Sequence, residues 1–458
     1  MDRISENKNY IRERMVHGPI WSTVWWLAWP SVITMLLQTA NGLVDALFVG
    51  RLGPDALSAV GLASQVMLVI MSISTAVSVG ATALVARFTG AEEIENAEHA
   101  TRQSILLGIF VGIASGALAY AAGPWLLKVM GGKGEALRLG LVYLNIILIA
   151  NVPYFLMYIF SGIYRGLGDM RTPLIIMMVT TVIALLGDYL LIFGIGPFPR
   201  LGVAGAGMAT DFSRIAAMLL FFIHLPKSQL RRVVQGSWRP VWSWFSRILN
   251  IGTPAGVQGL LRTGASVAYF AVLGLTPEGT YAIAALTIGL RMEALAFMPG
   301  FAFGTAATAM VGQNLGARQP DRAERAAWAS TWQGIAAMGL VGICFVAFAH
   351  PISRLFTSDP GVLPLAAQYL MINGISEPFF ALAMVLTGAL QGAGETRLPT
   401  AATIVTNWII RLPLTYYLAI TLGMGAFGAW ISMSGSTILL GFATLAVFKW
   451  SRWKEIRL

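Results

Sequence analysis

The chain has 458 residues, of which 56% are hydrophobic and only 11% charged, and its mean hydropathy is +0.70. Because soluble domains carry about 25% charged residues, this composition excludes an ordinary soluble protein and predicts an all-α polytopic membrane protein. The net charge of +10 does not indicate a nucleic-acid partner, because the basic residues lie mainly in short loops and tails.

The cysteine and histidine content excludes further classes. A single cysteine, Cys344, leaves no internal disulfide and no multi-cysteine metal site. The 4 histidines are scattered and form no metal-binding motif, so we expect no cofactor and no His-based metal site. The polar N-terminal sequence MDRISENKNYIRERM precedes a long apolar run without an A-x-A site, so no cleaved signal peptide is expected.

The apolar runs predict twelve membrane-spanning helices. In chain order they cover residues 20–49, 57–88, 99–127, 136–165, 171–196, 201–225, 242–274, 279–315, 322–349, 361–391, 397–421 and 425–449. We expect two six-helix lobes, residues 1–225 and 242–458, joined by a cytoplasmic linker at 226–241. Several runs exceed the roughly 20 residues that cross a bilayer, so tilted or bent helices are expected.

The distribution of Lys and Arg orients the chain. With the N-terminus in the cytoplasm, 21 of the 31 basic residues fall in inside segments or at the adjoining span ends, and 6 fall in outside loops. Because short cytoplasmic loops collect Lys and Arg, both termini and the linker are predicted to be cytoplasmic. We expect a monomer in the inner (plasma) membrane.

The first span carries a polar stripe. Its members, at i, i+4, i+7 and i+11, are Thr34, Gln38, Asn41 and Asp45, which share one face of a helix. A carboxylate at the centre of a span costs roughly 2.5–3.5 kcal/mol, and such a residue usually faces a bundle interior or a wet cavity. The stripe therefore indicates a proton or cation site, or alternatively a buried contact whose polar groups bond neighbouring helices.

Several blocks of the chain repeat at an offset of 226 residues. The matches are 81–91 with 307–317, Ala97-Glu98 with Ala323-Glu324, Tyr143-Leu144 with Tyr369-Leu370, and GIYRGLGDMRTP (162–173) with GALQGAGETRLP (388–399). Two halves with an even number of spans share one orientation in the membrane. The repeat therefore predicts parallel lobes with a binding cavity between them.

The motifs resemble those of the multidrug and toxic-compound extrusion (MATE) transporters over nearly the whole chain. The matching pieces are LVDALFVGRLGPDALSAVGLA (43–63), GLGDMRTP (166–173), GDYLLIFG (187–194), GVAGAGMAT (202–210), EALAFMPGFAFGTAATAMVGQNLGA (293–317) and GALQGAGETRLPT (388–400). The resemblance implies two six-helix lobes in a V shape. It also implies export of organic cations or other amphiphiles in exchange for protons or sodium.

Residue by residue, the resemblance gives a coupling site in the first lobe. Asp45 matches the family's first-helix acid, Asp188 its fifth-helix acid and Thr210 its sixth-helix threonine. The family's asparagine four residues before the fifth-helix acid is replaced here by Ala184. The missing amide weakens a sodium site, which needs several oxygen ligands, whereas two interacting carboxylates can still hold a proton. Asn41 could supply a replacement oxygen.

Other family acids are absent. The NorM-like branch has an acid about eight residues after the proline of helix seven, and here that position is Arg262. The helix-ten acid of that branch also has no match, although Glu377 lies about a turn away. These departures favour the DinF-like branch.

The remaining charges within spans leave alternatives open. Asp211 and Arg214, at i and i+3, either pair with each other or place Asp211 in the cation site beside Thr210. Arg291 and Glu293 cannot face each other at i and i+2, and a pair of Arg291 with Glu377 is one hypothesis. Arg262 and Arg411 give the second lobe a positive interior, and Asn407 and Arg411 are the repeat counterparts of Ala184 and Asp188. Glu293 and Glu377 either form structural pairs or bind a cationic substrate.

Candidates for the wall of a substrate cavity come from the first lobe. Methionine and aromatic side chains suit an adaptable amphiphile site. The candidates are Met35, Gln38, Met67, Met71, Tyr154 and Met157.

Two other functions compete with drug antiport. A flippase for lipid-linked sugars, from the related superfamily, would carry more basic cavity residues and extra spans. An intramembrane enzyme would need a nucleophile–base pair or a metal cage, and the sequence contains no DDxxD, HExxH, GxSxG or Walker A motif. We therefore expect a transporter of small cationic or amphiphilic substrates.

Overall fold

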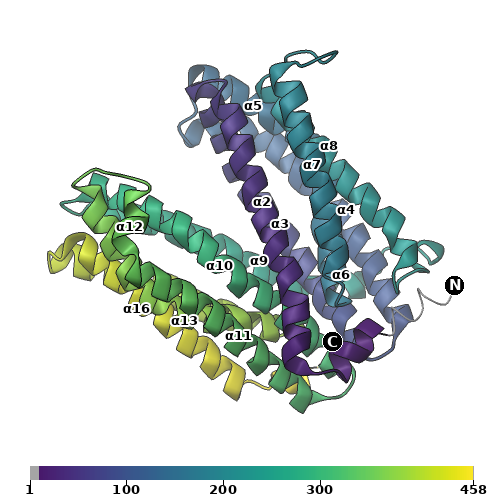
Figure 1. The fold of residues 1–458 in the computed structure, drawn as a ribbon. Coiled ribbons are helices and arrows are strands. Elements are labelled where there is room, and N and C mark those ends of the chain that lie inside the picture. Colours follow the sequence, from purple (N-terminus) through teal and green to yellow (C-terminus); the bar gives the residue numbers. More distant parts are fainter. Residues whose placement is uncertain (1–9, 457) are drawn as a thin grey trace. The chain divides into compact units, whose positions relative to one another are not determined.

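The computed structural model describes residues 10–456 and 458, and the regular structure of this part is helical without a strand (Figure 1). Its helices group into two compact units. Unit 1 comprises residues 10–13 and 33–256, and unit 2 comprises residues 14–32 and 257–458.

Unit 1 consists of long helices followed by two short 3₁₀ turns. It contains the second part of α2 (Ile20–Gly50), then α3 (Pro54–Gly90), α4 (Ile94–Val129), α5 (Gly134–Ile149), α6 (Asn151–Gly166), α7 (Arg171–Phe193), α8 (Val203–His224), η1 (Leu225–Lys227), η2 (Val233–Gln235) and the first part of α9 (Trp242–Leu273).

Unit 2 is also a series of helices, several of them long. It contains the first part of α2, the second part of α9, α10 (Gly279–Gly316), α11 (Pro320–Ala347), α12 (Ala349–Arg354), α13 (Val362–Ala393), α14 (Arg397–Ile404), η3 (Val405–Arg411), α15 (Leu412–Tyr416), η4 (Tyr417–Thr421), α16 (Gly425–Trp450) and η5 (Trp453–Glu455).

All twelve predicted spans are helical. In the described part of the chain, nine helices are long and apolar enough to cross a membrane, or ten if the bent pair α5 and α6 is one span. The other two predicted spans correspond to α9, which is long but less apolar, and to residues 397–421, which are divided into shorter helices.

The units divide α2 between residues 32 and 33 and α9 between residues 256 and 257. From the sequence we expected the lobes to meet in the 226–241 linker. Glycines explain why the first part of α9 groups with unit 1. A Cβ at Gly252 would lie 1.8 Å from the Ala76 carbonyl oxygen of α3, and one at Gly80 would lie 2.2 Å from the Ile248 carbonyl oxygen. Only glycine permits so close a crossing of two helices.

The internal repeat is reproduced in side-chain contacts. In unit 1 the Thr82 hydroxyl donates to the Gly162 carbonyl at 2.9 Å, and in unit 2 Thr308 donates to Gly388 at 2.8 Å. These contacts, with Gly166 beside Thr82 and Gly392 beside Thr308, form what we call the Thr–Gly clasp of each unit. Hydrogen bonds between membrane helices contribute about 0.6 kcal/mol each, so their value here is mainly to fix the register of the two helices.

The turns repeat as well. Glu92 and Arg318, 226 residues apart, have φ angles of 64° and 57°, and they are the only non-glycine residues with positive φ in the described chain. The carboxylates of Asp169 and Glu395 accept bonds from the backbone N–H groups two and three residues ahead, where α7 and α14 begin. The duplication therefore extends to the local geometry of the loops.

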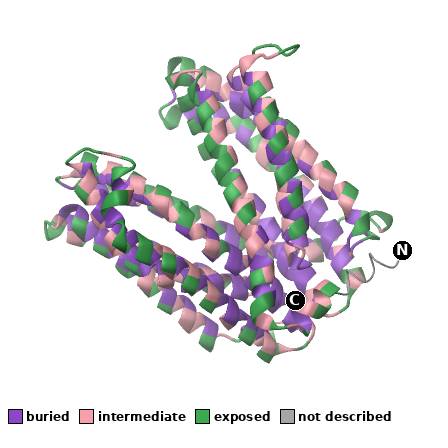
Figure 2. Cartoon of the chain, viewed as in Figure 1, coloured by how far each residue is buried: buried purple, intermediate pink, exposed green. Residues whose placement is uncertain are grey.

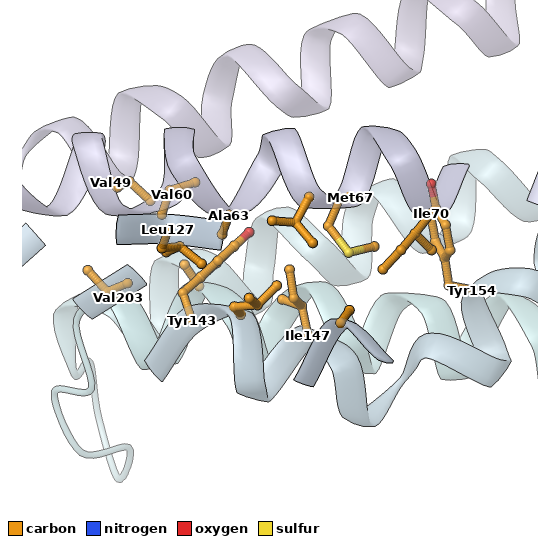
Figure 3. Close-up of a cluster of buried hydrophobic side chains, with 14 of the residues drawn as sticks. Val49, Val60, Ala63, Met67, Ile70, Leu127, Tyr143, Ile147, Tyr154 and Val203 are labelled. Carbon is orange, nitrogen blue, oxygen red and sulfur yellow. The ribbon is translucent and has the colours of Figure 1, made fainter. Parts of the chain in front are cut away.

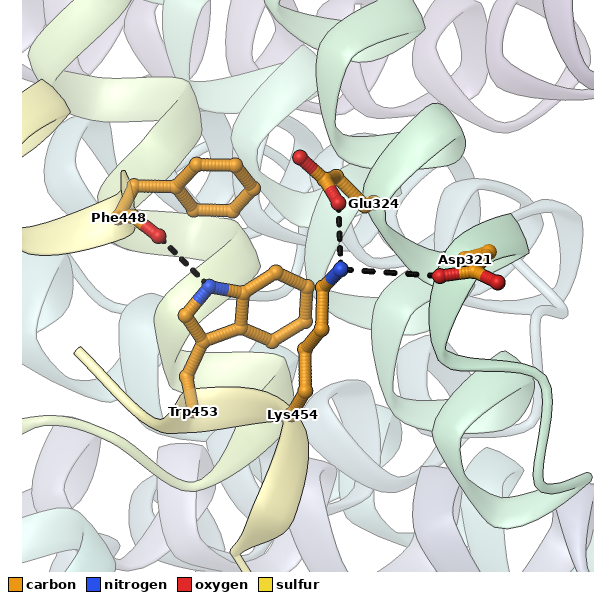
Figure 4. Close-up of polar contacts among 5 residues, drawn as sticks. All are labelled: Asp321, Glu324, Phe448, Trp453 and Lys454. Carbon is orange, nitrogen blue, oxygen red and sulfur yellow. Dashed lines mark hydrogen bonds and ion pairs between the residues drawn. The ribbon is translucent and has the colours of Figure 1, made fainter. Parts of the chain in front are cut away.

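Glu98 and Glu324 match each other in the internal repeat. Each binds the segment that follows a long helix, which is α8 for Glu98 and α16 for Glu324. Glu98 accepts a bond from the backbone N–H of Arg232, and Glu324 pairs with Lys454 after α16 (Figure 4). The neighbouring Trp453 is 2% exposed, and its indole N–H donates to the Phe448 carbonyl at 2.8 Å. Both units thus fix their trailing segment against the helix that carries the acid.

Buried apolar clusters fill the interior of each unit (Figure 2). In unit 1 the cluster includes Tyr143 and Tyr154 with Met67 and Ile70 of α3 (Figure 3). In unit 2 the counterpart of Tyr143 is Tyr369, which packs edge-on against Trp430 with ring centroids 4.9 Å apart.

The two units differ in two spans. The fourth span of unit 1 breaks at Ala150, where α5 and α6 meet at 56°, whereas the corresponding α13 is continuous. The fifth span of unit 2 contains two π-helical stretches, η3 and η4, whereas α7 is regular. π-Helical segments are rare and often carry functional residues.

Candidate functional site

Two carboxylates from different helices lie close together in unit 1. Asp45 on α2 and Asp188 on α7 are within electrostatic range of each other. Asp188 is 3% exposed, and Ala184, one turn before it, is also buried. The position expected to carry an amide in a sodium site thus presents a methyl group.

A tyrosine and a threonine complete this group. The side chains of Tyr143 on α5 and Thr210 on α8 lie near each other, and Tyr143 is within electrostatic range of both carboxylates. We call Asp45, Asp188, Tyr143 and Thr210 the acid pocket. Sequence reasoning missed Tyr143, because a lone aromatic residue in a span resembles core. The repeat match with Tyr369 is the signal that could have identified it.

Polar oxygens of the acid pocket lack protein partners. The Oδ1 atoms of Asp45, Asp188 and the adjacent Asn41 are buried and have no hydrogen-bond partner among the described residues. Buried polar atoms are nearly always bonded, so these free oxygens suit a carboxyl proton or a small bound cation.

Asp211 pairs with Arg214 in the structure. The Arg214 Nη1 atom lies 3.6 Å from Asp211 Oδ1, and both side chains are largely buried. Arg214 also donates to the Ile147 carbonyl at 3.1 Å, just before the break between α5 and α6. The pair thereby holds the last turn of α5 at this break. This geometry favours the alternative in which Asp211 pairs with Arg214 over the one in which it joins the cation site, although Thr210 is its neighbour.

Besides pairing with Asp211, Arg214 contacts aromatic residues. Its guanidinium lies 4.6 Å from the ring centroid of Tyr154, whose ring lies 4.9 Å from that of Tyr158. Arg214 is also within electrostatic range of Tyr143 in the acid pocket. A fixed positive charge therefore stands between the acid pocket and the bend in the fourth span.

A second polar cluster lies within unit 2. The Tyr369 hydroxyl donates to Glu293 Oε1 at 2.6 Å, and Glu377 is within electrostatic range of Glu293. Glu377 is 3% exposed, and its Oε2 atom has no hydrogen-bond partner among the described residues. The hypothesis that Glu377 pairs with Arg291 is not supported, because Arg291 is exposed and no ion pair of the described residues joins them.

The arginines of unit 2 have separate surroundings. Arg411, at the end of η3, donates to the hydroxyls of Ser436 and Thr437 at 2.6 and 3.0 Å. Asn407 is buried in the same π-helical stretch. Arg262 on α9 is exposed, with its guanidinium 5.2 Å from the ring centroid of Phe297.

The predicted cavity residues have mixed environments. Met67 and Tyr154 belong to the buried core of unit 1, and Met71 and Met157 pack against it. Gln38 is exposed and Met35 half-buried on α2. A cavity of about 660 Å³ in unit 1 lies elsewhere, beside Ser58, Gln65 and Lys133. No group of three or more His, Cys, Asp or Glu residues within 10–456 could hold a metal ion.

Comparison with known proteins adds independent information. A family model described as MatE matches residues 30–190 and 254–417. The chain is 30% identical over 454 residues to a protein of Thermotoga maritima named probable multidrug resistance protein NorM, covering 99% of this chain and 97% of the relative. It is 27% identical over 437 residues to a protein of Shewanella oneidensis named FAD transporter, covering 94% and 95% of the two chains.

A solved structure has the same fold. The crystal structure of a protein named MATE, in the bent conformation, superposes with a TM-score of 0.87 over 96% of each chain at 24% identity. This likeness confirms the predicted all-α fold of two pseudo-symmetric lobes.

Proposed function

Because this chain belongs to the MatE family of multidrug efflux transporters, we propose that it is a secondary active antiporter that exports cationic or amphiphilic compounds in exchange for protons. The observation that carries the proposal is the acid pocket, in which Asp45 and Asp188 approach each other beside Tyr143 and Thr210. Two neighbouring buried carboxylates disfavour double ionisation, so the pair holds a proton that an opposing gradient can load and release.

The preference for protons over sodium rests on Ala184. A hard cation such as sodium requires several oxygen ligands, and an alanine offers none from its side chain. Asn41 is the remaining side chain that could contribute an oxygen on α2.

The decisive experiment is efflux of a fluorescent cationic dye from proteoliposomes, with proton and sodium gradients imposed separately. A pH gradient without sodium should drive efflux, and Asp45→Asn and Asp188→Asn should each abolish that drive. The matched control is Asp55→Asn, because Asp55 is an exposed acid at the start of α3. Efflux driven by sodium alone at constant pH, and lost in Asp188→Asn, would overturn the proton assignment but retain the site.

A second substrate class is an anionic dinucleotide. The Shewanella relative is named a FAD transporter, and unit 2 exposes the arginines Arg262 and Arg291. The same vesicles loaded with FAD test this alternative. Release of FAD, lost in Arg262→Gln but retained in Arg354→Gln, would favour it over cationic drugs. A flippase role finds no further support.

We also propose the finer placement near the DinF-like branch, on the strength of Arg262 at the position of the helix-seven acid. The relative from Thermotoga is named NorM, so the names of relatives do not support this placement. Cytoplasmic termini are proposed from the distribution of charges. We also propose a monomer in the inner membrane.

A further inference from the structure

The linker between α8 and α9 is fixed on the start of α4. Three side chains, Glu98, Arg102 and Gln103, make the attachment, and each is at most 9% exposed. Glu98 Oε1 accepts from the Arg232 N–H at 2.8 Å. The Gln103 amide donates to the Arg239 carbonyl at 2.8 Å and accepts from the Val241 N–H at 2.9 Å. We call these three residues the linker clamp.

The linker clamp contacts main-chain atoms of the linker. Arg102 also contacts main-chain atoms, since its Nη1 atom lies 3.5 Å from the carbonyl oxygens of Arg232 and Val233. A Cβ at Gly236 would lie 2.1 Å from this nitrogen, so a larger residue there would displace the guanidinium. The buried side chains Leu230 and Val233 add apolar anchors on the inner side.

The side chains left outside are basic and aromatic. Lys227, Arg231, Arg232 and Arg239 are exposed, and none takes part in an ion pair of the described residues. Trp238 and Trp242 are 36% and 77% exposed. We call these six residues the linker patch.

No acid of the linker region neutralises this charge. The sequence contains no Asp or Glu from residue 212 to residue 277. Glu98, which faces the linker from α4, is buried and already accepts the bond from Arg232. The linker patch therefore presents four positive charges on a rigid backbone.

We propose that the linker patch binds the headgroups of anionic phospholipids at the membrane surface. The patch connects the end of one membrane helix to the start of another, so it lies at headgroup level. Tryptophan prefers this interfacial layer, and each Lys or Arg near an anionic bilayer strengthens binding by roughly fivefold. Because the clamp orders the backbone beforehand, binding does not have to order a flexible loop. The proposal is independent of the coupling ion and of the exported substrate.

Native mass spectrometry of the purified full-length transporter tests the proposal. The protein is titrated with phosphatidylglycerol and, separately, with phosphatidylcholine, and the lipid-bound fractions are compared. We expect the wild type to prefer phosphatidylglycerol, and the quadruple variant Lys227→Gln, Arg231→Gln, Arg232→Gln, Arg239→Gln to lose at least tenfold of that preference. Raising the salt from about 0.1 to 1 M, which shortens electrostatic range from about 10 to 3 Å, should weaken the wild-type preference.

The matched control removes the same charge elsewhere in unit 1. Arg51, Lys128, Lys133 and Arg200 are exposed but are not held by a clamp, and their fourfold change to Gln should lower the lipid preference much less than the linker variant does. A linker variant with Lys at positions 231, 232 and 239 should bind as the wild type does, since it keeps the charge. If the quadruple linker variant fails to fold, the double change Arg231→Gln, Arg239→Gln should still lower the preference by several-fold. Equal loss in the control, or an unchanged preference in a folded linker variant, would overturn the proposal.

Discussion

Arg214 is the residue that joins the bend in the fourth span to the acid pocket. It donates to the Ile147 carbonyl just before the break at Ala150 and pairs with Asp211 of its own helix. Removing one partner of a largely buried pair leaves the other charge uncompensated. We therefore expect Arg214→Gln to lower the free energy of unfolding by about 1–3 kcal/mol. Thermal unfolding of the purified protein in detergent measures this change.

The double variant separates pairing from packing. In Asp211→Asn with Arg214→Gln neither charge is left alone, so its destabilisation should fall short of the sum of the two single variants by at least about 0.5 kcal/mol. Strict additivity would mean that the two side chains act independently, in conflict with their 3.6 Å contact.

The proposed role of Tyr143 in the acid pocket depends on its hydroxyl group. Tyr143→Phe removes the hydroxyl near Thr210 and the two carboxylates and keeps the ring in the buried core. We expect gradient-driven efflux to fall roughly tenfold, the equivalent of about 1.4 kcal/mol, while the protein remains folded. Tyr154→Phe is the matched control, because Tyr154 lies in the same core cluster but outside the acid pocket. Equal losses in both variants would point to packing rather than to the pocket.

At the scale of elements, the Thr–Gly clasps hold pairs of long helices in contact. A Cβ at Gly392 would lie 2.2 Å from the Thr308 carbonyl oxygen, so Gly392→Ala must push α13 away from α10. We expect a loss of about 1–3 kcal/mol in the free energy of unfolding, which is typical of overpacking. Gly435→Ala on α16 is the control, because its Cβ would meet no atom within 4 Å. A stable Gly392→Ala variant would mean that the helices can separate without cost.

The sequence predicts these elements better than it predicts their interruptions. Apolar runs located every span, because hydropathy alone determines which segments favour the membrane. The 56° bend at Ala150 and the π-helical stretch around Asn407 were not foreseen, because they depend on which backbone groups bond to one another. Asp45 was predicted from the polar stripe of the first span as well as from family motifs, and Asp188 from family motifs. The role of Tyr143 and the bond from Arg214 to Ile147 required coordinates.

At the scale of the whole molecule, the charge bias predicts the topology. In a Cys344→Ala background, Ser237→Cys in the linker should be labelled only when a membrane-impermeant reagent reaches the cytoplasm. Ser358→Cys, in the exposed loop between α12 and α13, should be labelled from outside intact cells. Both sites are exposed serines, so differences in labelling report on the side of the membrane. Labelling of Ser237→Cys from outside intact cells would contradict the predicted orientation.

The linker clamp has a consequence for how such a transporter can evolve. Glu98, Arg102 and Gln103 bind main-chain atoms of the linker. Most linker residues can therefore be substituted without disturbing the fold of unit 1. The exceptions include the buried Leu230 and Val233, and also Gly236, where any side chain meets Arg102. Lineages living in membranes of different phospholipid content can therefore adjust this surface by single substitutions, while the machinery for export is inherited unchanged.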